Sequence, residues 1–133
     1  MVTAGSSAPL PLIDIIIPVY RDLAVTRACI ESVLASVLPD ATHIIVVEDS
    51  SPEPELREYC QSLATNTAIT VLHHEKNRGF VFSVNEGMRL HPDRDVVLLN
   101  SDTRVANNWL HRMQVAAWSD KQIASVTPFS NNA

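Results

Sequence analysis

The sequence predicts an α/β fold, a Rossmann-like and mostly parallel sheet with flanking helices. Two observations predict it. Short apolar runs alternate along the chain with amphipathic stretches of helical spacing. In these runs apolar residues mostly follow one another directly instead of alternating with polar residues, which is typical of strands buried on both faces of a parallel sheet. In such sheets ligands bind beyond the carboxyl ends of the strands, at a switch in strand order. We therefore expect functional residues where each apolar run stops.

The first half of the chain predicts two strand–helix units. A β-branched run over 13–19 predicts the first strand, and Asp22 is placed to cap the helix that follows. That helix should stop at Pro39-Asp40. Its apolar positions are Ile30, Val33, Leu34 and Val37. The run 43–47 predicts the second strand. Ser51-Pro52 predicts the start of the second helix, because proline fits the first helical turn. The stripe of that helix is Leu56, Tyr59, Cys60 and Leu63.

The second half continues the same alternation. Apolar runs over 69–72, 95–99 and 123–127 predict three more strands. The helix between the first two of these is marked by Phe80, Val84 and Met88. The helix between the last two is marked by Trp109, Leu110, Met113 and Ala117. We expect Gly87 to allow close packing of a helix on the sheet.

The composition is that of one globular domain. The chain has 133 residues, of which 46% are hydrophobic and 19% charged, enough for a single core. We expect residues 1–12 to form a flexible tail and residues 13–133 to form the domain. The formal net charge is -5 and no basic stretch occurs, so nucleic acid is excluded as a partner. No apolar run approaches the roughly 20 residues that cross a bilayer.

The two cysteines favour a reducing, cytoplasmic setting. Cys29 and Cys60 stand alone, without the spacing of a metal site. We expect each to be a small buried apolar side chain rather than half of a disulfide. The first ten residues also lack the basic start and long apolar stretch of a signal peptide.

Three strand ends carry polar or otherwise distinctive residues. They are Pro18-Val19-Tyr20, Glu48-Asp49-Ser50 and Asn100-Ser101-Asp102. A parallel sheet places them along one edge. A carboxylate such as Asp102, with phosphate oxygens and waters, suits Mg²⁺ or Mn²⁺. Taken alone, Asp102 is also explained as a helix cap or a turn residue and Asp49 as a helix cap, and these residues by themselves favour a functional role only slightly.

The loop after the third strand carries two cations. Arg78 lies beside Gly79 near a helix start, an arrangement that suits a phosphate as well as a solvated turn. For Lys76 we favour the solvated turn. The adjacent His73 and His74 should point to opposite faces of their strand. No dinucleotide-binding glycine motif or Walker A loop occurs, which argues against dehydrogenases and P-loop enzymes.

Four segments together resemble family 2 glycosyltransferases. The run 15–20 resembles their opening strand, which ends in P-x-Y/F, and 46–51 resembles their V-V-D-D-G-S. The segment 77–80, continued by 85–87, resembles N-x-G-F…N-x-G. The run 98–103 resembles the N-x-D-T form of the DXD motif, common in rhamnosyltransferase-like members. These matches span roughly residues 13–128, and their order and spacing make them specific.

The resemblance implies the N-terminal part of a GT-A fold that binds a nucleotide-diphosphate sugar and a divalent metal, Mn²⁺ or Mg²⁺. By analogy, Pro18, Val19 and Tyr20 would line the base and ribose pocket. Asp49 would hydrogen-bond the base, and Arg78 would lie near the base or diphosphate. Asn100 and Ser101 would lie close to ribose and phosphate, and Asp102 would coordinate the metal.

Three residues depart from the family pattern, and a second half is expected. Glu48 and Asn100 replace aspartates, and Ser50 replaces glycine. Family members carry a second half that binds the acceptor and supplies the base for inverting transfer. Since Asp120 is an unconvincing base, we expect the base beyond Ala133. The chain would then be a fragment that binds nucleotide weakly and does not turn over.

The resemblance also implies an acceptor and a location. The acceptor would be a carbohydrate or lipid-linked hydroxyl in cell-surface polysaccharide or glycolipid synthesis. The full-length protein would be cytoplasmic, with the inner face of the membrane as a peripheral location. One alternative is a non-catalytic nucleotide-binding or scaffold domain. The other is a sugar-phosphate nucleotidyltransferase, which would need a glycine-rich loop where 18–21 stands.

Overall fold

Strands and helices alternate along the chain as predicted. The computed structural model describes residues 12–36 and 38–118. The strands are β1 (Ile13–Val19), β2 (His43–Glu48), β3 (Ile69–His73) and β4 (Asp95–Leu98). The helices are α1 (Leu23–Ala35), α2 (Pro54–Leu63), α3 (Phe80–Arg89) and α4 (Trp109–Trp118). The predicted strand over 123–127, the helix position Val37 and all of the predicted tail except Leu12 lie outside the described residues.

The four strands form one parallel sheet in the order β3-β2-β1-β4. The central strand β1 pairs Ile15 with Ile44 of β2 on one side and with Val97 of β4 on the other. The chain thus runs outward from β1 in one direction and returns to the other side for β4. The predicted parallel α/β fold is confirmed, and a switch in strand order lies between β1 and β4.

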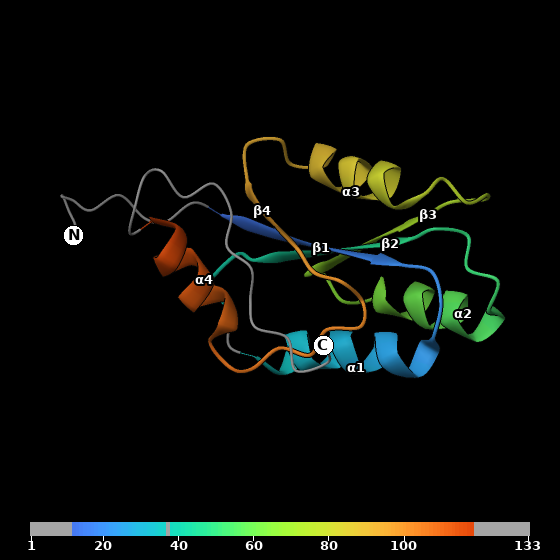
Figure 1. Ribbon diagram of the computed structural model, residues 1–133, viewed down its shortest axis with the longest axis horizontal. Coiled ribbons are helices and arrows are strands. Elements are labelled where there is room, and N and C mark those ends of the chain that lie inside the picture. Colours follow the sequence, from blue (N-terminus) through green and yellow to red (C-terminus); the bar gives the residue numbers. More distant parts are fainter. Residues whose placement is uncertain (1–11, 37, 119–133) are drawn as a thin grey trace.

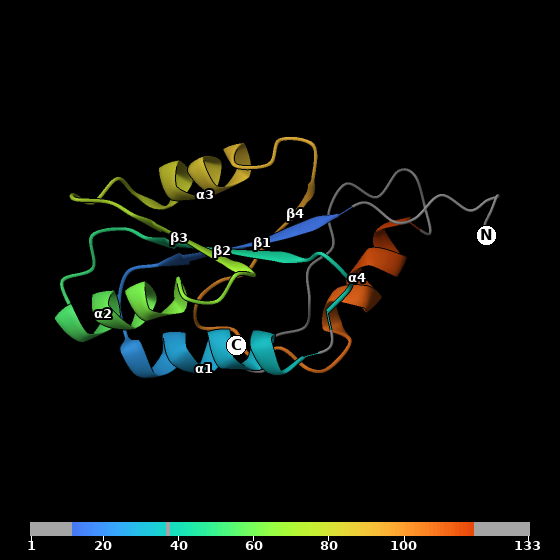
Figure 2. The same ribbon diagram turned by 180° about the vertical axis from the view of Figure 1, so that it is seen from behind.

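The sheet separates two layers of helices. Figures 1 and 2 show α3 over one face and α1 and α2 over the other. The larger core cluster includes Ile15 and Ile17 of β1, whereas Ile16 belongs to a smaller cluster that contains Ile45 and Val47. Successive residues of a strand point to opposite faces, so the continuous apolar run of β1 supplies both clusters.

A glycine lets α3 lie close to the sheet. A Cβ atom at Gly87 would lie 3.0 Å from Cγ2 of Ile16, whose side chain is fully buried. Any larger side chain would push against the core. The expected close packing at Gly87 is therefore confirmed.

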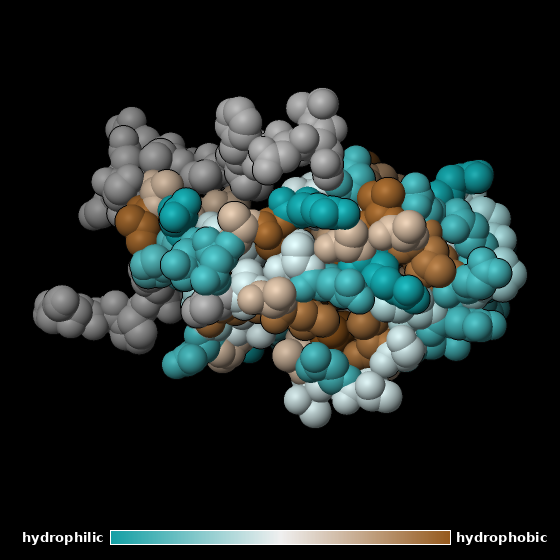
Figure 3. Space-filling view, turned by 90° about the horizontal axis from the view of Figure 1, so that it is seen from below, coloured by the Kyte–Doolittle hydropathy of each residue, from teal (hydrophilic) through white to brown (hydrophobic). Residues whose placement is uncertain are grey.

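The outer face of the second layer is of mixed polarity. Figure 3 shows this face with hydrophobic side chains in patches among hydrophilic ones. Val25 and Leu34 of α1 are among the exposed apolar residues. Within the described part of the chain, no helix combines the length and apolar character needed to span a bilayer.

The first helix begins as predicted but ends earlier. The Asp22 carboxylate accepts a hydrogen bond from the backbone N–H of Val25, at 3.2 Å, so the predicted cap is confirmed. The helix ends at Ala35 rather than at Pro39-Asp40. The reason is local: both the backbone N–H and the hydroxyl of Ser36 donate to the carbonyl of Val33, which closes the last turn before the proline.

The second helix begins at Pro54, so the predicted start at Ser51-Pro52 is wrong. The backbone N–H of Ser51 donates to Glu48 at 2.5 Å, and its hydroxyl accepts from the backbone N–H of Glu53 at 3.1 Å. These bonds tie the segment to the end of β2 and postpone the helix by two residues. The physical rule still holds, because a proline occupies the first helical turn.

Candidate functional site

An open pocket lies at the carboxyl ends of the strands, beside the switch in strand order. Its volume is about 530 Å³, within the range of small-molecule sites. Its lining comes from β1, from the ends of β2 and β4 and from the start of α3. The lining residues are Pro18, Val19, Tyr20, Arg21, Asp49, Asn77, Gly79, Phe80, Ser83, Asn100, Ser101 and Asp102. All of the predicted site residues except Arg78 are among them.

The end of β1 forms one wall. Val19 is buried, and its carbonyl accepts a hydrogen bond from the backbone N–H of Asp49 at 2.9 Å. The strand then stops, and the Tyr20 side chain is exposed. The guanidinium of Arg21 lies over the Tyr20 ring, 5.0 Å from its centroid. This wall therefore offers an aromatic ring and a cation side by side.

The segment after β4 forms the opposite wall, and α1 holds it in place. The backbone N–H of Thr103 donates to the carbonyl of Asn100 at 3.0 Å. This bond closes a turn that contains Asp102, the predicted metal ligand. The Cys29 thiol also donates to the Asn100 carbonyl, at 3.6 Å. Ser32 accepts from the backbone N–H of Val105 at 3.1 Å. Asp102 is thus a turn residue that also faces the pocket.

Cys29 remains a thiol in this position. Burial raises the pKa of Cys29 to about 12, and the negative charge of Asp102 adds to that rise. Cys29 and Cys60 are both buried and free. The prediction of small buried side chains rather than a disulfide is therefore confirmed.

Asp49 organises the floor of the pocket rather than capping α2. Its Oδ1 accepts from the backbone N–H of Arg78 at 2.7 Å and bonds Nδ1 of His74 at 2.8 Å. Its Oδ2 accepts from Nδ2 of Asn77 at 3.0 Å and from the backbone N–H of Gly79 at 2.9 Å. Burial acts to raise the pKa of Asp49, but these hydrogen bonds outweigh it and hold that pKa below its ordinary value.

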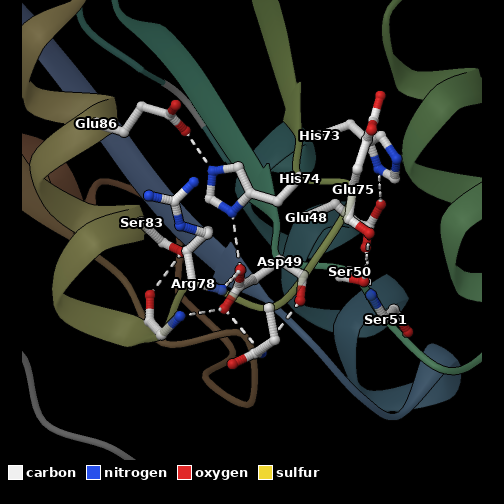
Figure 4. Close-up of polar contacts among 12 residues, drawn as sticks. Glu48, Asp49, Ser50, Ser51, His73, His74, Glu75, Arg78, Ser83 and Glu86 are labelled. Atoms are coloured by element: carbon white, nitrogen blue, oxygen red, sulfur yellow. Dashed lines mark hydrogen bonds and ion pairs between the residues drawn. The ribbon is translucent and has the colours of Figure 1, made fainter.

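His74 lies between two carboxylates, as Figure 4 shows. The ring is buried, with Nδ1 on Asp49 and Nε2 on Glu86 at 2.5 Å. Its neighbour His73 pairs with Glu48 instead. The two histidines therefore point to opposite faces, as predicted. No sequence pattern indicated the contact with Glu86, because His74 follows β3 and Glu86 belongs to α3.

The Arg78 side chain packs on an aromatic ring of α3. Its guanidinium lies over the Phe82 ring, 4.2 Å from the centroid, and its side chain is not part of the pocket lining. Its backbone N–H, bound to Asp49, is what it contributes to the floor. A direct contact with the base or diphosphate stays a prediction.

Several lining residues were not predicted as ligands. Asn77, Gly79 and Phe80 lie within the motif that identifies the loop, so a signal for them was present. Arg21 and Ser83 had none. Ser83 is fully buried and donates to the Gly79 carbonyl at 2.9 Å, which fixes the start of α3 against the loop.

The pocket fits a metal that arrives with a phosphate rather than a metal held by protein alone. Among residues 12–36 and 38–118, no group of three or more histidines, cysteines, aspartates and glutamates is close enough to hold an ion. Asp102 supplies one carboxylate beside Asn100 and Ser101. Mg²⁺ is commonly bound by one or two carboxylates, substrate phosphates and waters, and this donor set meets that description.

Comparison with known proteins gives a family match over most of the chain. The sequence model described as "Glycosyl transferase family 2" matches residues 14–132. Glycosyltransferase AglE of Haloferax volcanii is 22% identical over 107 residues, which cover 80% of this chain and 35% of AglE.

Solved structures share the fold. The mannosyltransferase PcManGT from Pyrobaculum calidifontis, in complex with GDP-Man and Mn²⁺, matches with a TM-score of 0.64 and 19% identity. The match covers 75% of this chain and 30% of PcManGT. GalNAc-T7, solved with UDP, GalNAc and Mn²⁺, matches with a TM-score of 0.66 and 17% identity, over 78% of this chain and 20% of that protein. The chain thus corresponds to a minor part of the length of each relative.

Proposed function

This chain belongs to glycosyl transferase family 2, and from that premise we propose that its pocket binds the nucleotide diphosphate of a sugar donor. One observation carries the proposal. Three strand ends that are far apart in sequence meet around one pocket at the β1/β4 switch. That is where open parallel sheets bind nucleotides.

We assign different parts of the nucleotide to different parts of the pocket lining. Tyr20 and Phe80 present exposed aromatic side chains to the pocket, which suit the flat faces of a base. Pro18 and Val19, at the end of β1, also line the pocket. Arg21 is a cation of the lining and suits a phosphate, because its fork of donors matches phosphate oxygens. Asn100 and Ser101, on the opposite wall, supply polar groups for ribose and phosphate.

Asp102 is the residue that we assign to the divalent cation, Mn²⁺ or Mg²⁺. Its carboxylate faces the pocket from the turn that Cys29 and Ser32 hold. Asp102 would hold the cation, and the chemistry supplied there would be neutralisation of the negative charge that develops on the leaving diphosphate. The solved complexes of PcManGT and GalNAc-T7 contain Mn²⁺, which supports this choice.

The proposed reaction is inverting transfer of a hexosyl or deoxyhexosyl group to an acceptor hydroxyl. The acceptor is a carbohydrate or a lipid-linked saccharide, in a protein that acts in the cytoplasm or at the inner face of a membrane. The base that deprotonates the acceptor is not assigned to a described residue. We expect the purified 133-residue chain to bind nucleotide without transferring sugar, and robust transfer by it would overturn that expectation.

Calorimetric titration tests the assignment of the pocket. GDP, UDP and dTDP are titrated into the chain with and without Mn²⁺. We expect metal-dependent binding of one of them, and its loss in Asp102→Ala. The matched control is Asp95→Ala, which removes an exposed carboxylate at the amino end of β4 and should leave binding unchanged.

Two outcomes would contradict the proposal. Unchanged metal-dependent binding in Asp102→Ala would remove the metal from this turn. Absence of binding by any of the three nucleotides to the folded chain would favour the scaffold alternative. The nucleotidyltransferase alternative gains no support from the family match.

A further inference from the structure

We propose that His74 is a positioning residue of this pocket: held as a doubly protonated ring between Asp49 and Glu86, it fixes Asp49 and, through it, the wall formed by Asn77, Arg78 and Gly79. Nucleotide binding should then weaken when the ring loses a proton. The inference rests on the proposed function of the pocket and names a residue outside its lining that controls it.

The geometry requires a donor at each nitrogen of the ring. Nδ1 lies 2.8 Å from a carboxylate oxygen of Asp49, and Nε2 lies 2.5 Å from one of Glu86. Ionised carboxylates only accept hydrogen bonds, and a neutral imidazole has only one N–H. Both contacts are therefore satisfied together when the ring carries two protons.

Asp49 has no acceptor site to spare for a base. A carboxylate has about four lone-pair sites. His74, Asn77 and the backbone N–H groups of Arg78 and Gly79 already occupy the two oxygens. The hydrogen bond from the base to Asp49 that the family resemblance implies would have to displace one of these donors. Asp49, itself a lining residue, therefore also acts on a nucleotide through the loop that it holds.

That loop is part of the pocket itself. Asn77 and Gly79 are lining residues, and Gly79 has a φ of 93°, a left-handed conformation that other residues rarely adopt. The backbone N–H groups of Arg78 and Gly79 donate to Asp49 rather than to a helix or a strand, so Asp49 is a main restraint on this loop. Loosening Asp49 would release the wall.

The charged groups around the ring favour its protonated form. Asp49 reaches it from the end of β2 and Glu86 from α3, and the Phe82 ring of α3 meets it edge-on at 5.4 Å between centroids. The Arg78 cation lies on Phe82, and Glu75 follows His74 in the chain. Burial acts to lower the pKa of His74, but the bonds and charges of Asp49 and Glu86 outweigh it and raise that pKa above its ordinary value.

The direction of the pH effect follows from that sign. Below the raised pKa the ring keeps both protons and both contacts. As the pH rises through that pKa, the His74 ring loses one N–H. The carboxylate that faced this N–H, of Asp49 or Glu86, then faces a nitrogen lone pair. We expect nucleotide affinity to fall about tenfold across this transition, the loss that accompanies one charge-assisted hydrogen bond.

The test joins two measurements between pH 6 and 9. NMR follows the ring signals of His74 and the amide signals of Asn77, Arg78 and Gly79 without ligand. Calorimetry measures the affinity for GDP, and for UDP in a second series, with Mg²⁺. We expect the ring and the loop amides to share one midpoint above the ordinary pKa of histidine, about 6.5, and the affinity to begin to fall at that midpoint.

Glu86→Gln is the informative variant. The Glu86 side chain is partly exposed to solvent, and glutamine keeps its size while removing its negative charge. Because that charge favours the protonated ring, the shared midpoint should move to lower pH. His74→Gln should abolish the transition, and Glu86→Gln keeps the test decisive if that variant does not fold. His73→Gln is the matched control. It removes the ring that pairs with Glu48 on the opposite face and should leave the midpoint where it is.

The outcomes separate this inference from the proposed function. Affinity that stays constant while His74 titrates would overturn the inference and leave the nucleotide site standing. Loop amides that ignore the His74 titration would overturn it even if no nucleotide binds. Failure of every nucleotide to bind, with loop amides that follow the ring, would instead refute the proposed function and support the positioning role.

Discussion

The two ends of the sheet use the same chemistry for different purposes. At the amino end, the buried carboxylate of Asp14 bonds Nδ1 of His91 at 2.7 Å and Nη1 of Arg94 at 3.2 Å. At the carboxyl end, the buried carboxylate of Asp49 bonds Nδ1 of His74 at 2.8 Å. Asp14 ties β1 to the turn between α3 and β4, which is scaffold. Asp49 ties a loop that lines the pocket.

The difference lies in the partners of each carboxylate. Asp14 is neutralised by side chains of the turn after α3, one of them a cation, and Arg94 also donates to the carbonyl of Ala41. Asp49 bonds the side chains of His74 and Asn77, but it also accepts from two backbone N–H groups that have no helix or sheet to join. A buried acid that orders irregular backbone beside a pocket points to function more strongly than one that joins side chains.

We expect the largest loss of stability from a substitution at the amino end of the sheet. Asp14→Ala leaves the cation of Arg94 and the ring of His91 without their buried partner, so we expect a loss of about 3 kcal/mol in the free energy of unfolding. Urea denaturation measures it. The folded fraction should still bind nucleotide with unchanged affinity. Weaker binding that remains after correction for the unfolded fraction would erase the distinction between the two ends.

Asp49→Asn should affect both stability and binding. The variant keeps the size of the side chain but turns one acceptor into a donor, which then faces a donor of the loop, such as the Gly79 N–H. We expect a loss of about 2 kcal/mol in unfolding free energy, together with weaker nucleotide binding. Stability falling without any change in affinity would show that Asp49 is scaffold, as Asp14 is.

Gly87→Ala probes the helix that joins the two ends. The added Cβ would meet Ile16 at 3.0 Å, and the cost of overpacking exceeds the gain in helix propensity, leaving a net loss of about 1 kcal/mol. Combination with Ile16→Val should recover part of that loss, because the two residues are in contact. Additive effects in urea denaturation would place the strain elsewhere.

The smallest expected effect is on the pH dependence of stability, to which His74 and His43 should contribute with opposite signs. The pKa of His74 is raised, so its contribution to stability is fully present below about pH 6.5 and is lost as the pH rises through the folded value. Burial lowers the pKa of His43 at the amino end, with smaller effects from Asp14, His91 and Arg94. Its contribution is present above about pH 6.5 and is lost as the pH falls through the folded value.

Urea denaturation at several pH values separates these slopes. The stability difference between wild type and His74→Gln should shrink with rising pH. The difference between wild type and His43→Gln should shrink with falling pH. Slopes of the same sign would contradict the assignment of opposite surroundings to the two rings.

The sequence predicted the sheet and the helix faces well, because continuous apolar runs and helical spacing determine them directly. It located the pocket because strand ends in a parallel sheet must meet at one edge. It failed where individual side-chain contacts override the pattern of apolar residues. Glu48 holds Ser51, three residues further on, and delays α2, and Glu86 of α3 completes the contacts of His74. The first contact depends on the path of the backbone after β2 and the second on where α3 lies, and the pattern of apolar residues determines neither.

We propose that the carboxyl end of the sheet, and not the amino end, binds a nucleotide with its metal. Paramagnetic broadening of amide NMR signals by Mn²⁺, added with GDP or UDP, distinguishes the two ends. Because broadening falls steeply with distance from the ion, the amide signals of Ser101 and Asp102 should vanish first, followed by Gly79, while those of His91 and Arg94 persist. Broadening centred on the turn that holds His91 and Arg94, or equal at both ends, would contradict the claim.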